Sequence, residues 1–485
     1  MPFPIVINSS FETLPVVRNV TDQSQGPWII GGDLWALCER NSDSADPPVM
    51  QPQMMRSTDG GETWAGVDSD GAPTSSPHNS LPQVDGCIGG DGTTIYVFYD
   101  VQTFVTSGDS MVEEIHLYVC PFNTLTGTWG SPTGPGPMVI GNSLRGNNMA
   151  YRSAYRPGDN KILVLHPTSP TTISVDAPGG TGGNFTYCAA GLSFFDVESS
   201  SWSTDPITIY SPVDPGHTVD SNANPEDEPI DYSVPQIVMG QSNLAHLFWY
   251  SRGQGLGYSG GGSNLKYYLR LLYASCSATN TIAPVDPTPL TSTTWDSMGG
   301  SPLQWGTGVP SIRYNGDSTE SEIILPYNDS AQLQVWTAPD TTSTTWTGTT
   351  IMTDPDGGWV SHVGVDGEAA YLWWSQDHNG GGNADSIRQS KSMFIGDPWS
   401  SPSTLFKDLD AGDGFSFFWG RWAGGAPRIM YGWVDTLKYW QPNGPSAQDL
   451  TGSTGIPTSS GTGAGGLLST GGTTDTGQHV IYLAY

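Results

Sequence analysis

The sequence predicts an all-β protein, a single β-propeller of about seven four-stranded blades, with six or eight blades as alternatives. Three observations lead to this prediction. Glycine (62) and proline (38) are abundant while charged residues make up only 13% of the chain, which suits short strands and frequent turns. Lysine and glutamate are too few to cover long helices. A strand phrase also recurs along most of the chain, as radial sheet repeats require.

The recurring phrase is a short strand, a Gly/Asp turn, a strongly apolar strand, a third strand and a Ser/Thr/Gly turn that ends in tryptophan. The clearest copy begins at Leu81 and runs through CIGGDG, TTIYVFYD and EEIHLYVCPF to NTLTGTW. The closing tryptophans of successive copies are Trp64, Trp129, Trp202, Trp295, Trp346 and Trp399. Their spacing leaves room for four short strands in each copy.

The copies define expected blades that together form one domain over residues 1–485. We place these blades at about 26–68, 79–131, 145–206, 231–296, 309–350, 358–402 and 415–450. Inserts at 211–230 and 253–263 lengthen two copies and indicate loops that grow on one face. We expect the apolar strand at 478–485 to pair with the N-terminal blade and close the ring, because closure removes exposed strand edges.

The charge and the terminal sequence restrict the partners. A formal net charge of −30 repels phosphate backbones, so we predict no nucleic-acid binding. The N-terminus lacks a basic start and an uninterrupted apolar stretch, so we predict no signal peptide. No stretch approaches 18 apolar residues, so we predict no membrane insertion. We expect synthesis in the cytoplasm, with incorporation into a virion or extracellular assembly as a hypothesis.

The cysteines show no metal-binding spacing, and we favour free thiols over a disulfide framework. They are Cys38, Cys87, Cys120, Cys188 and Cys276, an odd number of widely spaced residues. Most lie in or beside apolar strand sequences, so we predict buried free thiols.

One turn carries a recognisable motif. Residues 57–64 read STDGGETW, in which Ser57, Asp59, Gly61 and Trp64 fill the four defining places of the S-x-D-x-G-x-x-W Asp-box. The chain therefore resembles the Asp-box (BNR-repeat) propellers of the sialidase-like superfamily. In that family the box is structural, and the hairpin chemistry agrees, because Asp59 can accept N–H bonds and the indole can fold back into apolar packing.

The resemblance also implies where to look for an active site. Sialidase-like enzymes clasp a substrate carboxylate with three arginines, the first in an F/Y-R-I-P phrase before the first box. Here Arg18 lies in VVRNV and Arg40 in CERN, and neither matches that phrase. Arg428, in APRIMYGW, comes far later in the chain. These departures count against sialidase activity.

The first strand of each blade would face a central channel. Polar residues on or beside these strands are the ligand-binding candidates: Asp85, Arg152, Arg156, Arg313, His362 and Arg421. In a chain with only 17 lysines and arginines, such basic residues could form an anion or sugar pocket. The alternative is that they are scattered and paired with local acids.

Catalytic and metal residues cannot be singled out among 47 acidic residues. A glycosidase needs two carboxylates, and Asp85, Asp100, Asp366 and Asp377 are candidates. Two oxygen-rich stretches are candidate Ca²⁺ loops, with Asp408, Asp410 and Asp413 in one and Asp220, Glu226, Asp227 and Asp231 in the other. We predict no other cofactor.

Three functions remain open from the sequence. The leading hypothesis is a non-catalytic propeller that binds a glycan or a protein partner, as a component of a phage virion or surface assembly. The alternative is an Asp-box-type glycoside hydrolase, which requires a deep pocket with two carboxylates at catalytic spacing. A purely architectural spacer would instead show large flat apolar contacts.

Overall fold

In the residues that it describes, the computed structural model consists of β-strands, turns and two short 3₁₀ turns, η2 (Pro157–Asp159) and η4 (Gln241–Asn243). It describes residues 25–42, 49–58, 65–67, 72–73, 84–107, 110–141, 151–175, 183–203, 206–210, 230–259, 262–295, 311–315, 320–328, 332–341, 345–353, 361–366, 368–376, 386–407, 417–423, 426–433, 436–440, 448–449, 468–473 and 479–484. Within these ranges no helix is long and apolar enough to cross a membrane.

The chain divides into two compact units. Unit 1 comprises Met1–Asn41, Gln53–Val67 and Pro302–Tyr485, and unit 2 comprises Ser42–Pro52 and Asp68–Ser301. The expectation of one ring over the whole chain stays a prediction.

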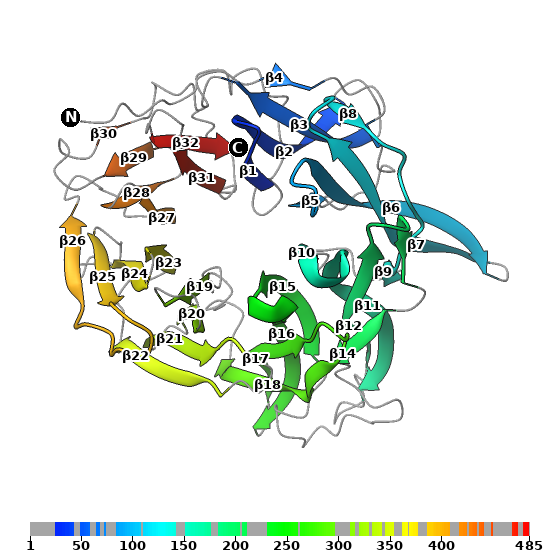
Figure 1. The fold of residues 1–485 in the computed structure, drawn as a ribbon. Coiled ribbons are helices and arrows are strands. Elements are labelled where there is room, and N and C mark those ends of the chain that lie inside the picture. Colours follow the sequence, from blue (N-terminus) through cyan, green and yellow to red (C-terminus); the bar gives the residue numbers. More distant parts are fainter. Residues whose placement is uncertain are drawn as a thin grey trace. The chain divides into compact units, whose positions relative to one another are not determined.

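Unit 2 contains three antiparallel sheets in chain order (Figure 1). The first has β5 (Val84–Ile88), β6 (Thr94–Ser107), β7 (Ser110–Asn123) and β8 (Thr128–Trp129), with β9 (Met138–Gly141) on β7; the second has β10 (Arg152–Arg156), β11 (Lys161–Val175), β12 (Gly183–Asp196) and β13 (Ser201–Trp202), with β14 (Ile207–Tyr210) on β12; the third has β15 (Ile230–Met239), β16 (Ala245–Ser259), β17 (Gly262–Cys276) and β18 (Ile282–Trp295).

Unit 1 contains four four-stranded sheets and a hairpin. They are β1 (Gln25–Ile30), β2 (Asp33–Ser42), β3 (Val49–Ser57) and β4 (Ala65–Gly66); β19 (Ser311–Tyr314), β20 (Ser321–Asn328), β21 (Gln332–Pro339) and β22 (Thr347–Thr353); β23 (Ser361–Asp366), β24 (Ala369–Gln376), β25 (Ser386–Ser392) and β26 (Ser403–Lys407); β27 (Phe417–Ala423), β28 (Ala426–Trp433), β29 (Thr436–Trp440) and β30 (Gln448–Asp449); and the hairpin of β31 (Leu468–Thr473) and β32 (His479–Ala484). A few residues of β2 and β3 belong to unit 2.

Each larger sheet is an up-and-down meander whose four main strands pair in chain order. This topology is consistent with propeller blades, which are four-stranded antiparallel sheets. The prediction of an all-β chain made of such sheets is therefore confirmed at that level.

Two closing tryptophans occupy equivalent places in their sheets. Trp129 of β8 pairs with Phe122 of β7, and Trp202 of β13 pairs with Phe195 of β12. The ring centroids lie 5.0 and 5.5 Å apart, and both pairs are edge-to-face. Trp202 also contacts Phe98 of the preceding sheet at 5.8 Å, so this indole packs between two sheets.

Neighbouring sheets share apolar cores. One core joins the first two sheets of unit 2 and includes Phe98, Leu117, Ile162 and Phe195. Another joins the second and third sheets of unit 2, and a third joins the β19–β22 and β23–β26 sheets of unit 1. Because sheets cover both faces of β11, the consecutive residues Ile162–Leu165 are all buried, with Ile162 and Val164 in the first of these cores and Leu163 and Leu165 in the second.

The C-terminal strand β32 pairs with β31. Within unit 1, β31 lies beside both β1 and β27 (Figure 1). The expected pairing of residues 478–485 with the N-terminal blade stays a prediction. Of the Asp-box, Ser57 ends β3, and Asp59, Gly61 and Trp64 lie outside the described residues.

Candidate functional site

The six ligand-binding candidates all lie on first strands of sheets. Asp85 is on β5, Arg152 and Arg156 on β10, Arg313 on β19, His362 on β23 and Arg421 on β27. The side chains of His362 and Arg421 lie outside what the structure describes. The remaining four fall into three separate groups.

Asp85 and Arg152 come together where β5 meets β10. The Asp85 carboxyl is 2% exposed and its Oδ2 accepts both the N–H and the Oγ–H of Ser153, each at 2.5 Å. Burial raises the pKa of Asp85, while the charge of Arg152 and the Ser153 bonds act in the opposite direction. Arg152 itself is half-buried and donates to the Tyr151 carbonyl.

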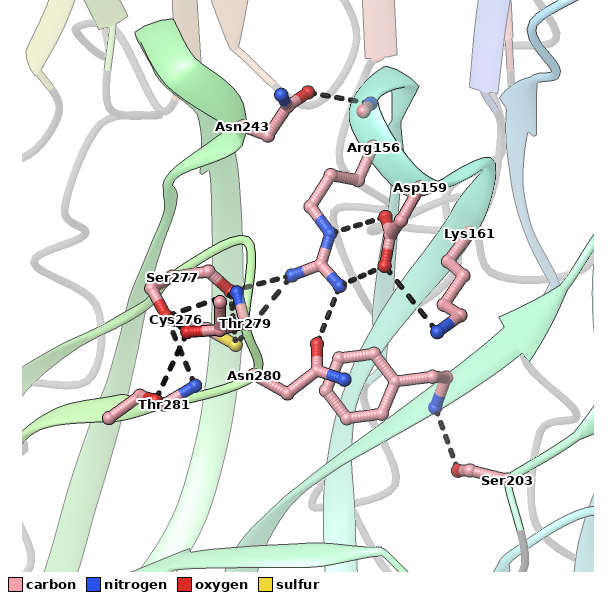
Figure 2. Close-up of polar contacts among 12 residues, drawn as sticks. Arg156, Asp159, Lys161, Ser203, Asn243, Cys276, Ser277, Thr279, Asn280 and Thr281 are labelled. Atoms are coloured by element: carbon pink, nitrogen blue, oxygen red, sulfur yellow. Dashed lines mark hydrogen bonds and ion pairs between the residues drawn. The ribbon is translucent and has the colours of Figure 1, made fainter.

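Arg156, at the end of the same strand, reaches into the third sheet of unit 2 (Figure 2). Its side chain is fully buried. Nε and Nη2 donate to the two carboxylate oxygens of Asp159 at 2.7 and 2.6 Å. Nη1 donates to the Ser277 carbonyl at 2.9 Å, and Nη2 also donates to Asn280 Oδ1 at 2.5 Å. Four oxygen atoms and, at 3.9 Å from Nη1, the Cys276 sulfur therefore accept from the guanidinium.

The local sequence explains this arrangement. Pro157 starts the η2 turn and Asn160 ends it with φ 52°, so the chain reverses within RPGDN and brings Asp159 back to Arg156. Burial alone would raise the pKa of Asp159, but the hydrogen bonds and charge of Arg156, with Lys161, outweigh it and hold that pKa below its ordinary value. Asp159 is therefore ionised in the folded protein near neutral pH.

Arg313 of β19 makes an equivalent set of contacts in unit 1. Its side chain is 1% exposed, and Nε donates to Glu322 of β20 at 2.8 Å. Nη1 donates to the Glu368 and Ser392 carbonyls, and Nη2 to Ser392 Oγ. Ser392 ends β25, the third strand of the next sheet.

The two buried arginines therefore share one design. Each lies near the end of a first strand, pairs with an acid of its own sheet and donates to the end of the third strand of the following sheet. We call these the Arg156 socket (Arg156, Asp159, Ser277 and Asn280) and the Arg313 socket (Arg313, Glu322, Glu368 and Ser392). Their donors are used inside the protein, so this geometry joins sheets rather than presenting a charge to a ligand.

The candidate acids and calcium residues give no described metal site. Asp100 of β6 is fully buried. The backbone of Asp366 ends β23 and that of Asp231 lies in β15, but the structure does not describe their side chains; Asp377, Asp220, Glu226, Asp227, Asp408, Asp410 and Asp413 lie outside the described residues. Among the described residues, no three His, Cys, Asp or Glu side chains are placed to hold a metal. Cys87, Cys120 and Cys276 are free thiols, and the last two are buried.

A buried His166–Ser193 pair was not predicted. Both side chains are almost fully buried in the β11–β12 pair. His166 Nδ1 donates to the Pro167 carbonyl and Nε2 accepts from Ser193 Oγ–H, both at 2.8 Å. Burial lowers the pKa of His166 to about 4. A single histidine in an apolar strand sequence does not reveal its partner, so the sequence alone could not distinguish this buried pair from a catalytic one.

Three long hairpins are the most distinctive feature of unit 2. The second and third strands of its sheets have 14 or 15 residues each, whereas β20, β21, β24 and β25 have 7 or 8. The first strands stop pairing at Tyr99, Leu165 and Gly253. β6 continues for eight residues beyond Tyr99, about 27 Å at the rise of a strand.

These hairpins project on the same side of unit 2. The turns between first and second strands, at the opposite ends of the sheets, lie together: a Cβ on Gly90 would meet the Tyr155 hydroxyl at 1.9 Å, and Gly158 N–H donates to Asn243 Oδ1 at 2.8 Å (Figure 2). Asp85 and Ser153, the second residues of their strands, also lie side by side. The three sheets therefore run in the same direction, and the long hairpins extend away from the Arg156 socket.

Comparisons with known proteins assign no family. No protein-family model and no curated protein matches the chain. Among solved structures, the chain is similar to a Penicillium chrysogenum α-L-arabinanase complexed with arabinobiose (14% identity, 82% of this chain and 99% of the other, TM-score 0.38). It is also similar to a Fusarium graminearum α-L-arabinofuranosidase (14%, 78% and 95%, 0.33) and to a Trypanosoma rangeli sialidase mutant displaying trans-sialidase activity (10%, 88% and 54%, 0.34). Similarity at this level assigns neither a family nor an activity.

Proposed function

We propose that this protein is a non-catalytic β-propeller of seven blades that binds an uncharged glycan through the three long hairpins of unit 2. The observation that supports this proposal is that the hairpins β6–β7, β11–β12 and β16–β17 all project on the same side of unit 2. Propeller loops that lengthen on one side of successive blades form a natural contact surface. The seven sheets of four or more strands among the described residues support this blade count.

The composition of the hairpins supports an uncharged partner. Beyond the residues that pair with the first strands, the extensions are residues 100–117, 166–191 and 254–267, and they contain one basic residue, Lys266. They are rich in Gly, Ser and Thr and carry aromatic residues such as Phe104, Tyr187 and Tyr258. Tyrosine, serine, glycine and asparagine are the residues that binding loops favour, because they combine rigid contact area with adaptable hydrogen bonding. Hairpins with a single lysine offer little positive charge to an anionic sugar.

The sockets support a binding role over a catalytic one. Arg156 and Arg313 would have been natural anion ligands on first strands, yet both are buried and saturated by acceptors of the protein itself. Asp85 is likewise engaged by Ser153. The polar residues described on these strands therefore serve sheet contacts.

Shortening the hairpins tests the proposal. Replacing Phe104–Glu113 with Asn-Gly keeps the Thr103–Glu114 pair as the closing pair and gives the turn a favourable sequence. Replacing Leu256–Leu265 with Asn-Gly does the same on the Gly255–Lys266 pair. Leu125→Ser is the control, because this 74% exposed side chain lies in the β7–β8 turn, at the other end of the first sheet.

The assay is binding to a panel of neutral and acidic glycans, with thermal melting as a check of folding. We expect the wild type and Leu125→Ser to bind neutral glycans and the shortened proteins to lose at least tenfold in affinity with unchanged melting. Equal binding by folded shortened proteins would refute the hairpin surface. Binding to a protein instead of any glycan would refute the glycan assignment. Release of sugar from the panel would establish the alternative, a glycoside hydrolase.

A further inference from the structure

A cross-strand pair in unit 1 has two buried hydrogen-bond donors without acceptors. Trp374 of β24 lies directly opposite Arg388 of β25, so the two side chains share one face of the sheet, with Cβ atoms about 5 Å apart as in any such pair. Within the described part of the chain, neither Trp374 Nε1 nor Arg388 Nε has a hydrogen-bond partner, and both atoms are buried. Buried donors in folded proteins nearly always have a partner, so these two N–H groups need an acceptor.

The other nitrogens of Arg388 are held by neutral acceptors. Nη1 donates to Gln376 Oε1 of β24 at 2.9 Å, and Nη2 donates to the carbonyl of Pro402, just before β26, at 3.4 Å. The guanidinium is therefore fixed between its two neighbouring strands, and its Nε–H group takes no part in these contacts. No carboxylate among the residues with described side chains pairs with it.

The lack of an acid distinguishes Arg388 from other arginines of this chain. Arg56, Arg156 and Arg313 each pair with an aspartate or glutamate. Acids are plentiful, since the chain has 47 of them against 17 lysines and arginines. Taking a guanidinium out of water without a negative partner costs free energy, so the Arg388 charge is as poorly matched as its Nε–H group.

The surroundings of Trp374 supply no acceptor. Its side chain is fully buried in the core that joins the β19–β22 and β23–β26 sheets, where it packs with Leu333, Val335 and Leu372. Arg388 is half-buried, so the pair can be reached from the solvent on the arginine side. An acceptor for both N–H groups must therefore be small and must come from solution.

We propose that Trp374 and Arg388 form a binding site for a small monovalent anion such as chloride at the junction of the β19–β22 and β23–β26 sheets. A chloride ion accepts from both N–H groups and supplies the negative charge that Arg388 lacks. A water molecule would need acceptors for its own protons and would leave the guanidinium charge unmatched. The net charge of −30 repels anions at long range, so these two donors, and not general attraction, produce the binding. The site belongs to unit 1, and the inference does not depend on what the hairpins of unit 2 bind.

Crystals of the full chain grown in sodium bromide test the site directly. Bromide replaces chloride and is located by its anomalous scattering. We expect a bromide ion in hydrogen-bonding contact with both Trp374 Nε1 and Arg388 Nε. A water molecule at this position, a position filled by protein atoms, or bromide found only elsewhere on the surface, as an adventitious ion only, would overturn the proposal.

Thermal melting in solution gives an independent measurement. Chloride replaces gluconate, an anion too large for this site, at constant ionic strength, so that general screening does not change. The wild-type melting temperature should rise with chloride and then level off, because a ligand that binds only the folded state stabilises it by mass action. Trp374→Phe, which removes the N–H group, and Arg388→Lys, which keeps the charge without Nε, should each weaken chloride binding at least tenfold.

Trp373→Phe is the matched control. Trp373 is the next residue of β24 and equally buried, but its Nε1 already donates to Gln389 Oε1 at 2.9 Å. This variant should melt at a lower temperature and keep the wild-type response to chloride. A chloride response that is absent from the wild type, or retained in Trp374→Phe and Arg388→Lys, would overturn the proposal. Should Trp374→Phe fail to fold, Arg388→Lys and the bromide position decide the question.

Discussion

Replacing Arg156 with methionine should destabilise unit 2 strongly. The substitution removes a fully buried guanidinium. It leaves the Ser277 carbonyl and Asn280 Oδ1 without the Arg156 donor, and Asp159 with only the Lys161 ammonium. Breaking a buried pair by removing one partner costs about 3–5 kcal/mol. The Asp159 side chain is 26% exposed and can regain water, so we expect the lower end, about 3 kcal/mol.

A matched control is available in unit 1. Arg56 of β3 pairs with Asp33 and lies over the Trp35 ring, but the side chains of the pair are 44% and 22% exposed. Because exposed pairs contribute about 0–1 kcal/mol, Arg56→Met should have a small effect. The measurement is the free energy of unfolding in urea, with hydrogen exchange of the Ser277–Asn280 segment as a local probe. If Arg156→Met costs no more than Arg56→Met, the sockets do not hold the sheets together and our account of them is wrong.

Three further predictions concern other buried positions. Burial lowers the folded-state pKa of His166 from 6.5 to about 4, so its contribution to stability should be complete above about pH 6.5 and lost as the pH falls toward 4. The free energy of unfolding, measured in urea at several pH values across this range, should therefore depend less steeply on pH in a His166→Phe, Ser193→Ala double variant. An unchanged pH dependence would contradict the assignment. Gly191→Ala should lower the unfolding free energy by about 1–3 kcal/mol, because its Cβ would lie 2.7 Å from the Thr168 Cγ2; a wild-type melting temperature would count against this packing. Arg313→Met should destabilise the β19–β22 and β23–β26 sheets by about 3 kcal/mol in urea unfolding, and an effect below about 1 kcal/mol would show that its socket is not equivalent to that of Arg156.

The strands were predictable because their signals are local. Apolar strand sequences mark each copy and a closing tryptophan marks six of the seven, and Trp129 and Trp202 take equivalent places opposite Phe122 and Phe195. Placing the charged residues on first strands followed from the same alignment. The three described cysteines are free thiols, as expected, although Cys87 is only half-buried.

The partners of those charged residues were not predictable. The Arg156–Asp159 pair could have been predicted from RPGD, because its members are only three positions apart. Ser277 and Asn280 lie more than 120 residues further along, and nothing in the sequence links them to β10. The environment of Asp85 depends on burial between two sheets, and a sequence shows donors near a carboxylate but not the water that packing removes.

The position of the sockets has a consequence for how this chain can change. The Arg156 socket lies at the end of the sheets that carries the turns between first and second strands, and the long hairpins extend from the other end. Residues can thus be inserted into or removed from the hairpins without disturbing the ion pairs that bind one sheet to the next. Length changes in the hairpins therefore leave the contacts that hold the sheets of unit 2 together in place.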